Sequence, residues 1–169
     1  MFEEKIIALT GATGAMGGEV LSHLLESENT YQFKILIHNA RHIRRFFKSL
    51  VKKGRGRIQI VHGSLTNYAT VAQLVSGADY VIHCGAVIPP RADHNPDNAF
   101  AVNYGGTKNI VDAIKASGRA DRIKLVHIST VAVYGSRNHR HPWARMGDPV
   151  MSSAYDYYSA AKIKAERYV

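Results

Sequence analysis

Short apolar runs alternate along this chain with longer segments in which apolar residues recur every three or four positions. Short apolar runs are typical of buried strands, and the recurring spacing is typical of amphipathic helices. The runs predict strands at residues 5–9, 33–37, 57–61, 80–83 and 124–128. The periodic segments predict helices at residues 16–27, 41–52, 68–75, 98–116 and 155–169. This alternation predicts an α/β fold, a doubly wound (Rossmann) parallel sheet with helices on both faces.

The ends of the predicted elements are marked by turn-forming residues. Gly77 and Gly118 follow the third and fourth predicted helices, where glycine is favoured as a C-terminal stop. The stretch 136–153 contains two prolines and little periodicity, so it is predicted to be a long loop. The sequence shows no internal repeat, low-complexity tract or interdomain linker, and it therefore predicts one domain over residues 1–169.

A glycine-rich segment joins the first predicted strand to the first predicted helix. It has the sequence Thr10-Gly11-Ala12-Thr13-Gly14-Ala15-Met16-Gly17-Gly18. Gly11 permits a tight turn, Gly14 lets a phosphate approach bare backbone, and Gly17 lets the helix pack close to the strand. A lone glycine motif is often an ordinary loop. The strand before it and the helix after it favour a site for the diphosphate of a dinucleotide.

A second candidate site involves Tyr158 and Lys162, which are four residues apart and therefore share one face of the last predicted helix. A tyrosine hydroxyl is ordinarily a poor base, but a neighbouring ammonium favours the phenolate, so such a pair can exchange protons near neutral pH. Taken alone, a pair at this spacing is usually a surface pair. Ser129 and Thr130 follow the fifth strand, at the edge where open α/β sheets bind ligands, or else they stabilise the next turn.

These features together resemble the extended short-chain dehydrogenase/reductase family, which comprises NAD-dependent epimerases, dehydratases and 3β-hydroxysteroid-type reductases. The resemblance covers residues 5–169. Its motifs are Thr10 to Gly17, Gly63-Ser64-Leu65-Thr66, Val81-Ile82-His83-Cys84-Gly85-Ala86, Val102-Asn103-Tyr104-Gly105-Gly106-Thr107, His127-Ile128-Ser129-Thr130 with Tyr134-Gly135, and Tyr158 to Lys162.

The resemblance implies a role for each of four candidate catalytic residues. Tyr158 is the implied acid/base, and Lys162 assists it while holding the nicotinamide ribose. Thr130 is implied to hydrogen-bond the reacting oxygen, and Asn103 to order a water-linked proton path. The implied reaction is hydride transfer between C4 of a nicotinamide and a carbinol or carbonyl carbon of a small-molecule substrate. The implied cofactor-binding residues are Gly11, Thr13, Gly14, Ala15, Met16, Gly17, His38, Arg41, Ser64, Leu65, Cys84, Gly85, Ala86, Tyr158 and Lys162.

Three departures from the family pattern change the details of this expectation. His38 stands where NAD-specific members have an acidic residue on the adenosine ribose, and Arg41 follows closely, which favours NADP over the alternative, NAD. Ser64 replaces an aspartate that usually contacts adenine. Val131 and Ala132 replace the acidic residues that follow the catalytic threonine in dehydratases, so a dehydratase is disfavoured.

The family also has a sixth strand and a substrate-binding region, neither of which follows the helix of Lys162 in this sequence. We therefore expect residues 1–169 to form an NAD(P)-binding domain that lacks the C-terminal substrate-binding region. Such a chain is expected to bind cofactor weakly and to turn over negligibly. A non-catalytic NADP-binding module and an inactive fragment are the alternatives to an enzyme.

Composition narrows the class of partner and compartment. The net charge of +9 is concentrated at residues 41–57, which contain eight Lys and Arg and no acidic residue. This stretch lacks the interleaved aromatic residues that stack on bases, so we expect a solvated helix or a phosphate contact and no nucleic acid. Cys84 is the single cysteine, and no signal peptide or membrane-length apolar run is present, so a reduced cytoplasmic setting is expected. His139 and His141 lack a third ligand, and no metal is expected.

The resemblance further implies a homodimer. Family members commonly pair the two helices that correspond to residues 98–116 and 155–169 into a four-helix bundle, and both are predicted here.

Overall fold

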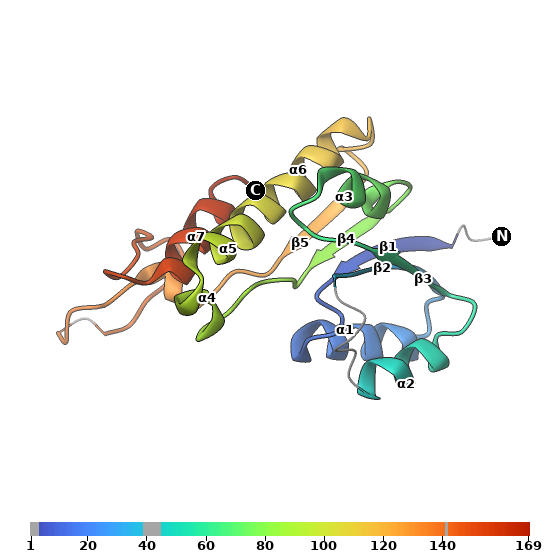
Figure 1. Cartoon of the computed structure of the whole chain (residues 1–169), viewed down its shortest axis with the longest axis horizontal. Coiled ribbons are helices and arrows are strands. Elements are labelled where there is room, and N and C mark those ends of the chain that lie inside the picture. Colours follow the sequence, from blue (N-terminus) through green and yellow to red (C-terminus); the bar gives the residue numbers. More distant parts are fainter. Residues whose placement is uncertain (1–3, 39–44, 141) are drawn as a thin grey trace.

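The computed structural model describes residues 4–38, 45–140 and 142–169, and it contains one five-stranded parallel sheet (Figure 1). The strand order is β3-β2-β1-β4-β5, so the chain winds outward from β1 in both directions. The strands are β1 (Lys5–Thr10), β2 (Tyr31–Ile37), β3 (Ile58–His62), β4 (Tyr80–His83) and β5 (Lys124–His127). The predicted doubly wound parallel sheet is confirmed.

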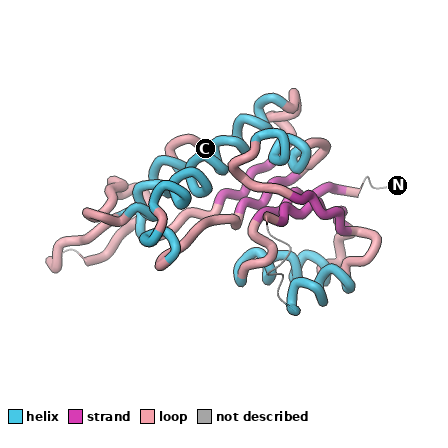
Figure 2. The backbone as a smooth tube through the Cα atoms, viewed as in Figure 1, coloured by secondary structure: helices cyan, strands magenta, loops and turns pink. Residues whose placement is uncertain are grey.

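Helices cover both faces of this sheet (Figures 1 and 2). On one face lie α1 (Ala15–Glu26) and α2 (Arg45–Lys53). On the other lie α3 (Tyr68–Val75) and α6 (Gly106–Ala116). The remaining helical segments are α4 (Arg91–His94), α5 (Pro96–Phe100), the π-helix η2 (Ala101–Gly105), the 3₁₀ helix η3 (Val131–Tyr134) and α7 (Tyr157–Glu166). The last helix, α7, packs against α5 and η2.

The core consists of two apolar layers because each central strand points its side chains alternately to the two faces. Ile7 and Leu9 of β1 join the layer under α1 and α2, whereas Ala8 between them joins the layer under α3 and α6. In β2, Ile35 and Ile37 likewise join the layer under α1 and α2, whereas Leu36 joins the layer under α3 and α6. Burial on both faces explains the continuous apolar runs at residues 6–9 of β1 and 35–37 of β2.

Two predicted helices have different limits in the structure. The predicted helix 98–116 begins earlier, at Pro96, with Asn95 as its cap, and it is interrupted by the π-helix η2. The predicted helix 155–169 begins at Tyr157, because Tyr155 has a left-handed backbone (φ 60°) and Asp156 caps the next turn through Ser159 N. The short helices α4 and η3 were not predicted. Residues 41–44 of the predicted second helix lie outside the described residues.

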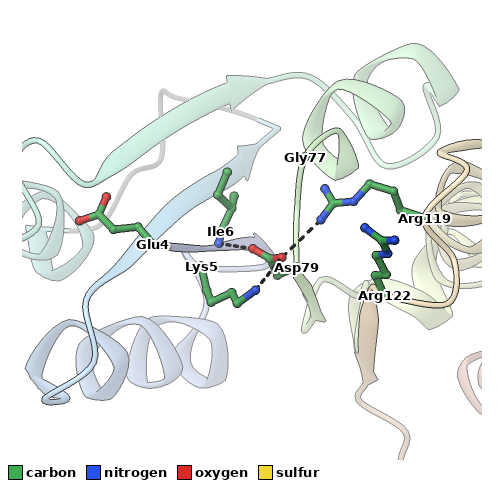
Figure 3. A pocket seen from close by; sticks show the side chains of 7 residues that line it. All are labelled: Glu4, Lys5, Ile6, Gly77, Asp79, Arg119 and Arg122. Carbon is green, nitrogen blue, oxygen red and sulfur yellow. Dashed lines mark hydrogen bonds and ion pairs between the residues drawn. The ribbon is translucent and has the colours of Figure 1, made fainter. Parts of the chain in front are cut away.

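A cluster of charged residues joins three elements at the amino ends of the strands (Figure 3). Asp79 accepts a hydrogen bond from the backbone N of Ile6 at 2.9 Å and pairs with Lys5 Nζ at 3.4 Å and Arg119 Nη2 at 3.3 Å. With Arg122 these residues line a pocket of about 480 Å³. The glycine-rich turn follows the carboxyl end of β1, so this pocket lies at the opposite edge of the sheet. We therefore assign the cluster a structural role.

We expect Asp79→Asn to lower the free energy of unfolding by about 1–2 kcal/mol at neutral pH, because two cations and a backbone N–H lose a charged acceptor. Burial is the largest single influence and raises the pKa of Asp79, but these three partners together outweigh it and lower the pKa. Such a carboxylate stabilises the fold above its unfolded pKa and loses that contribution as pH falls through its folded pKa. Urea denaturation over a range of pH values measures the difference.

The matched control is Glu26→Gln, which removes a carboxylate that pairs with Lys53 at the exposed surface. We expect little change from it, since solvent screens such pairs. A difference between wild type and Asp79→Asn that is the same at acid and neutral pH would contradict the assignment.

Candidate functional site

The glycine-rich turn brings the end of β1 against the loop that follows β4. Gly11 has φ +75°, and a Cβ there would lie 2.7 Å from the carbonyl carbon of Cys84 and from Gly85 N. A Cβ on Gly17 would lie 2.4 Å from Gly11 O. Neither position has room for a side chain, so the close approach of strand, turn and helix requires glycine at both.

The first turn of α1 leaves backbone N–H groups facing solvent. Gly14 is the N-cap, and no side chain in the described part of the chain caps this helix. Gly14, Ala15 and Met16 are exposed, and Thr13 is half-buried. The N-terminal N–H groups of a helix lack intrahelical partners and carry its positive dipole end, so this turn suits a bound diphosphate. The residues present therefore fit the phosphates of a dinucleotide.

The other predicted cofactor contacts lie at the carboxyl ends of β2, β3 and β4. His38 is exposed directly after β2, whereas Arg41 lies outside the described residues. Ser64 stabilises the turn after β3, since its Oγ lies 2.8 Å from Thr66 Oγ1 and accepts from Thr66 N at 3.2 Å. The side chain of Leu65 belongs to the core, and its carbonyl oxygen accepts from Asn109 Nδ2 at 2.8 Å.

After β4, the segment Cys84-Gly85-Ala86 borders the glycine turn. Burial raises the pKa of the Cys84 thiol, so it remains protonated at neutral pH. The backbone N of Gly85 donates to Thr10 Oγ1 at 3.0 Å, and Ala86 is exposed.

A chain of buried hydrogen bonds runs beneath this loop, with His83 at its centre. His83 Nδ1 lies 2.7 Å from Thr10 Oγ1, and Nε2 lies 3.0 Å from Thr107 Oγ1. Thr107 donates its only hydroxyl proton to Asn103 O at 2.7 Å, so it accepts from His83 Nε2–H. His83 Nδ1 then accepts from the Thr10 hydroxyl. Burial, with smaller effects from His127 and Lys162, lowers the pKa of His83 to about 3, which keeps the ring neutral.

Asn103 links the π-helix η2, in which it lies, to the loop after β4 by hydrogen bonds. Its Oδ1 accepts from Val87 N at 2.7 Å and its Nδ2 donates to Val87 O at 2.9 Å. Both ends of the amide are thus engaged, and Asn103 is buried within the π-helix η2. The role in a water-linked proton path that the resemblance implies stays a prediction.

Lys162 is a buried cation at the carboxyl end of β5. It is 4% exposed, donates from Nζ to Ile128 O at 2.5 Å, and lies 3.4 Å from His127 Nε2. Burial lowers the pKa of Lys162, and the charge of Glu166 opposes this effect. A buried ammonium next to carbonyl and imidazole acceptors can serve as a fixed positive charge for a neighbouring phenol.

Tyr158 lies one helical turn before Lys162 in α7 and is half-buried. Thr130 caps η3, since its Oγ1 accepts from Ala132 N at 3.3 Å, and α7 packs against η3. Ser129 donates to the carboxylate of Glu166. The predicted catalytic hydroxyls therefore follow the same edge of the sheet as the glycine turn.

His83 and His127 are the site residues to which the sequence analysis gave no role. They are direct partners in the register of β4 and β5, and their ring centroids are 5.6 Å apart. The available signal was a histidine at the last position of the predicted strand 80–83 and at the next-to-last position of the predicted strand 124–128. The described residues contain no group of three or more His, Cys, Asp and Glu that could hold a metal ion, and His141 is not among them. None of the described helices is long and apolar enough to cross a bilayer.

Comparison with known proteins gives one family over nearly the whole chain. A family model described as the NAD dependent epimerase/dehydratase family matches residues 7–169. UDP-glucose 4-epimerase of Rickettsia canadensis is 32% identical in an alignment 143 positions long, which covers 79% of this chain and 39% of that protein. Mouse 3 beta-hydroxysteroid dehydrogenase type 7 is 26% identical over 166 residues, 97% of this chain and 43% of that protein.

Solved structures show the same fold. WbmH of Bordetella bronchiseptica, solved in complex with NAD+, has a TM-score of 0.77 at 24% identity, covering 98% of this chain and 52% of that one. DesIV of Streptomyces venezuelae, a dTDP-glucose 4,6-dehydratase solved with NAD and TYD bound, has a TM-score of 0.77 at 20% identity, covering 98% and 50%. The chain thus spans about half the length of the proteins it matches.

Proposed function

Because this chain belongs to the NAD-dependent epimerase/dehydratase family, we propose that it is the cofactor-binding part of an NAD(P)-dependent oxidoreductase or epimerase. The main support is the pair of Tyr158 and the buried Lys162 on α7, on the same edge of the sheet as the glycine turn. The proposed substrate is a small molecule with a carbinol or carbonyl carbon. The curated relatives are named for a nucleotide sugar and for a steroid, so both classes are candidates.

The proposed chemistry divides between binding and proton transfer. A bound nicotinamide dinucleotide would accept or supply the hydride. The N–H groups at the start of α1 would hold its diphosphate, and Lys162 its nicotinamide ribose. Lys162, as an ammonium, would stabilise the negative charge that develops on Tyr158 Oη while Tyr158 takes or gives the substrate proton. Thr130 Oγ1 would hydrogen-bond the substrate oxygen and orient it toward Tyr158.

In the longest natural form of the protein, we expect Tyr158→Phe to reduce turnover by a factor of about 10²–10⁴ while the Kd for cofactor changes little, because only the proton-transferring oxygen is lost. The measurement is the absorbance of reduced nicotinamide with UDP-sugar and 3β-hydroxysteroid substrates. The control is Tyr157→Phe, which removes an exposed hydroxyl that has no lysine four residues later.

Measurable turnover that is equal in wild type and Tyr158→Phe would refute the proposed catalytic role. A chain that binds the dinucleotide but turns over none of the substrates would support the second candidate, a non-catalytic NADP-binding module or an inactive fragment.

We propose NADP as the preferred cofactor. His38 cannot repel a 2′-phosphate as an acidic residue would, and Arg41 follows three positions later in the sequence. Calorimetric titration is expected to give a Kd for NADP about tenfold lower than for NAD, the effect of one charge-assisted contact. Arg41→Gln is expected to remove this preference. Arg122→Gln, at the opposite edge of the sheet, is the control. A lower Kd for NAD in the wild type would contradict the proposal.

We also propose that the chain forms a homodimer through α5, η2, α6 and α7. This face presents aromatic rings beneath lysines, with Lys164 Nζ 5.2 Å from the ring centroid of Phe100 and 4.6 Å from that of Tyr104. Phe100 and Tyr104 lie beside each other, with centroids 5.4 Å apart. Phe100 is exposed and Tyr104 is half-buried, and partly exposed aromatic residues are common in interfaces between proteins.

Light scattering at micromolar concentration is expected to give the mass of a dimer for the wild type and of a monomer for Phe100→Lys, which places a second ammonium beside Lys164. Tyr68→Lys alters an exposed aromatic residue on α3 and is expected to leave the dimer intact. A wild-type monomer at this concentration would refute the interface.

A further inference from the structure

Lys162 is held at the end of β5 by two acceptors from consecutive residues. Its Nζ donates to Ile128 O at 2.5 Å and lies 3.4 Å from His127 Nε2. An ammonium has three donors and no acceptor, so the second contact requires a lone pair on Nε2. The ring proton of His127 must then lie on Nδ1. That atom is buried and has no hydrogen-bond partner in the described part of the chain.

The His127 ring lies beside a second histidine whose own ring is fixed by hydrogen bonds. His83 lies beside it on β4, with ring centroids 5.6 Å apart and an interplanar angle of 43°. His83 is itself fixed through both of its nitrogens, by Thr10 and Thr107. An Nδ1–H group without a partner costs free energy. In the other tautomer, however, the Nε2–H group would point at the Lys162 ammonium, which is also a donor. Nδ1 has no partner among the described residues in either tautomer, so the contact with Lys162 decides for the proton on Nδ1.

The charged and titratable groups around Lys162 come from three elements. Glu166 follows Lys162 on α7. His83 and His127 are the last residues of β4 and β5, and Cys84 comes directly after β4. Burial, followed by the charge of Lys162 and opposed by Glu166, lowers the pKa of His127 to about 4. At neutral pH the ring therefore has no charge and can accept a hydrogen bond.

We infer that His127 is a positioning residue for Lys162, fixing the ammonium through Nε2 so that it faces Tyr158 and a nicotinamide ribose. The effect on cofactor rests on the proposed function, but the contact itself does not. Two variants distinguish the effect of the ring's shape from the effect of the hydrogen bond that His127 accepts. His127→Phe keeps a ring beside His83 and removes the acceptor, whereas His127→Gln keeps an acceptor on an uncharged side chain.

The first test is calorimetric titration of the 169-residue chain with NADP and with NAD. His127→Phe is expected to raise the Kd of the preferred cofactor by about three- to tenfold, because the ammonium loses one of its two fixed acceptors. His127→Gln is expected to remain within about twofold of the wild type. The matched control, His62→Phe, changes the last residue of β3, which is exposed, and is expected to leave Kd unchanged.

The second test is nuclear magnetic resonance of the wild-type histidine ring nitrogens and of the Lys162 side chain, assigned with Lys162→Met. At neutral pH we expect His127 to be neutral with its proton on Nδ1, and to titrate with a pKa of about 4. In His127→Phe the pKa of Lys162 is expected to fall below its wild-type value, and His127→Gln is expected to restore it.

The outcomes separate this inference from the proposed function. A proton on Nε2 of wild-type His127 overturns the inference even if every variant fails to fold. An unchanged Lys162 pKa and an unchanged Kd in His127→Phe also overturn it. If the wild type binds neither dinucleotide, the proposed function fails. The histidine tautomer and the Lys162 pKa then decide the positioning role without cofactor.

Discussion

The site depends on one directional chain of buried hydrogen bonds centred on His83. Gly85 N–H donates to Thr10 Oγ1, whose hydroxyl donates to His83 Nδ1, and His83 Nε2–H donates to Thr107, which donates to Asn103 O. The chain joins β1, β4, η2 and α6, and it has a consistent direction only when the imidazole is neutral. An unpaired polar group here would cost its full desolvation free energy, so the loop after β4 and the glycine turn are fixed together.

The two edges of the sheet consequently have different physical roles. At the amino edge, Asp79 is fully occupied by Ile6 N, Lys5 and Arg119, and this cluster joins the first strand to the fourth. At the carboxyl edge, the N–H groups of the first α1 turn have no capping side chain among the described residues. The polar groups around Asp79 satisfy one another, whereas the N–H groups of the first α1 turn remain available to a ligand, as expected for an open α/β sheet.

The sequence was sufficient for the features that depend on local pattern. The apolar runs identified all five strands, with β4 at its exact limits, and the run is clearest in β1, where Ile7, Ala8 and Leu9 are all buried. The glycine spacing and the four-residue interval between Tyr158 and Lys162 needed only local geometry. The π-helix η2 could not be predicted, because Asn103 forms its bonds with Val87 in a distant loop. The roles of His83 and His127 depend in the same way on pairing between strands.

The burial of Lys162 explains why the end of β5 has polar acceptors. A cation that is 4% exposed loses most of its hydration, and this loss favours the neutral amine. The proposed chemistry needs the ammonium, so the protein must replace water with fixed acceptors. Ile128 O is one, and an apolar side chain at position 127 would leave the ammonium with that single close acceptor. A carboxylate there would attract the ammonium more strongly but would neutralise the positive charge on which the proposed chemistry depends. A neutral imidazole meets both requirements, since it accepts a hydrogen bond and leaves the positive charge uncompensated.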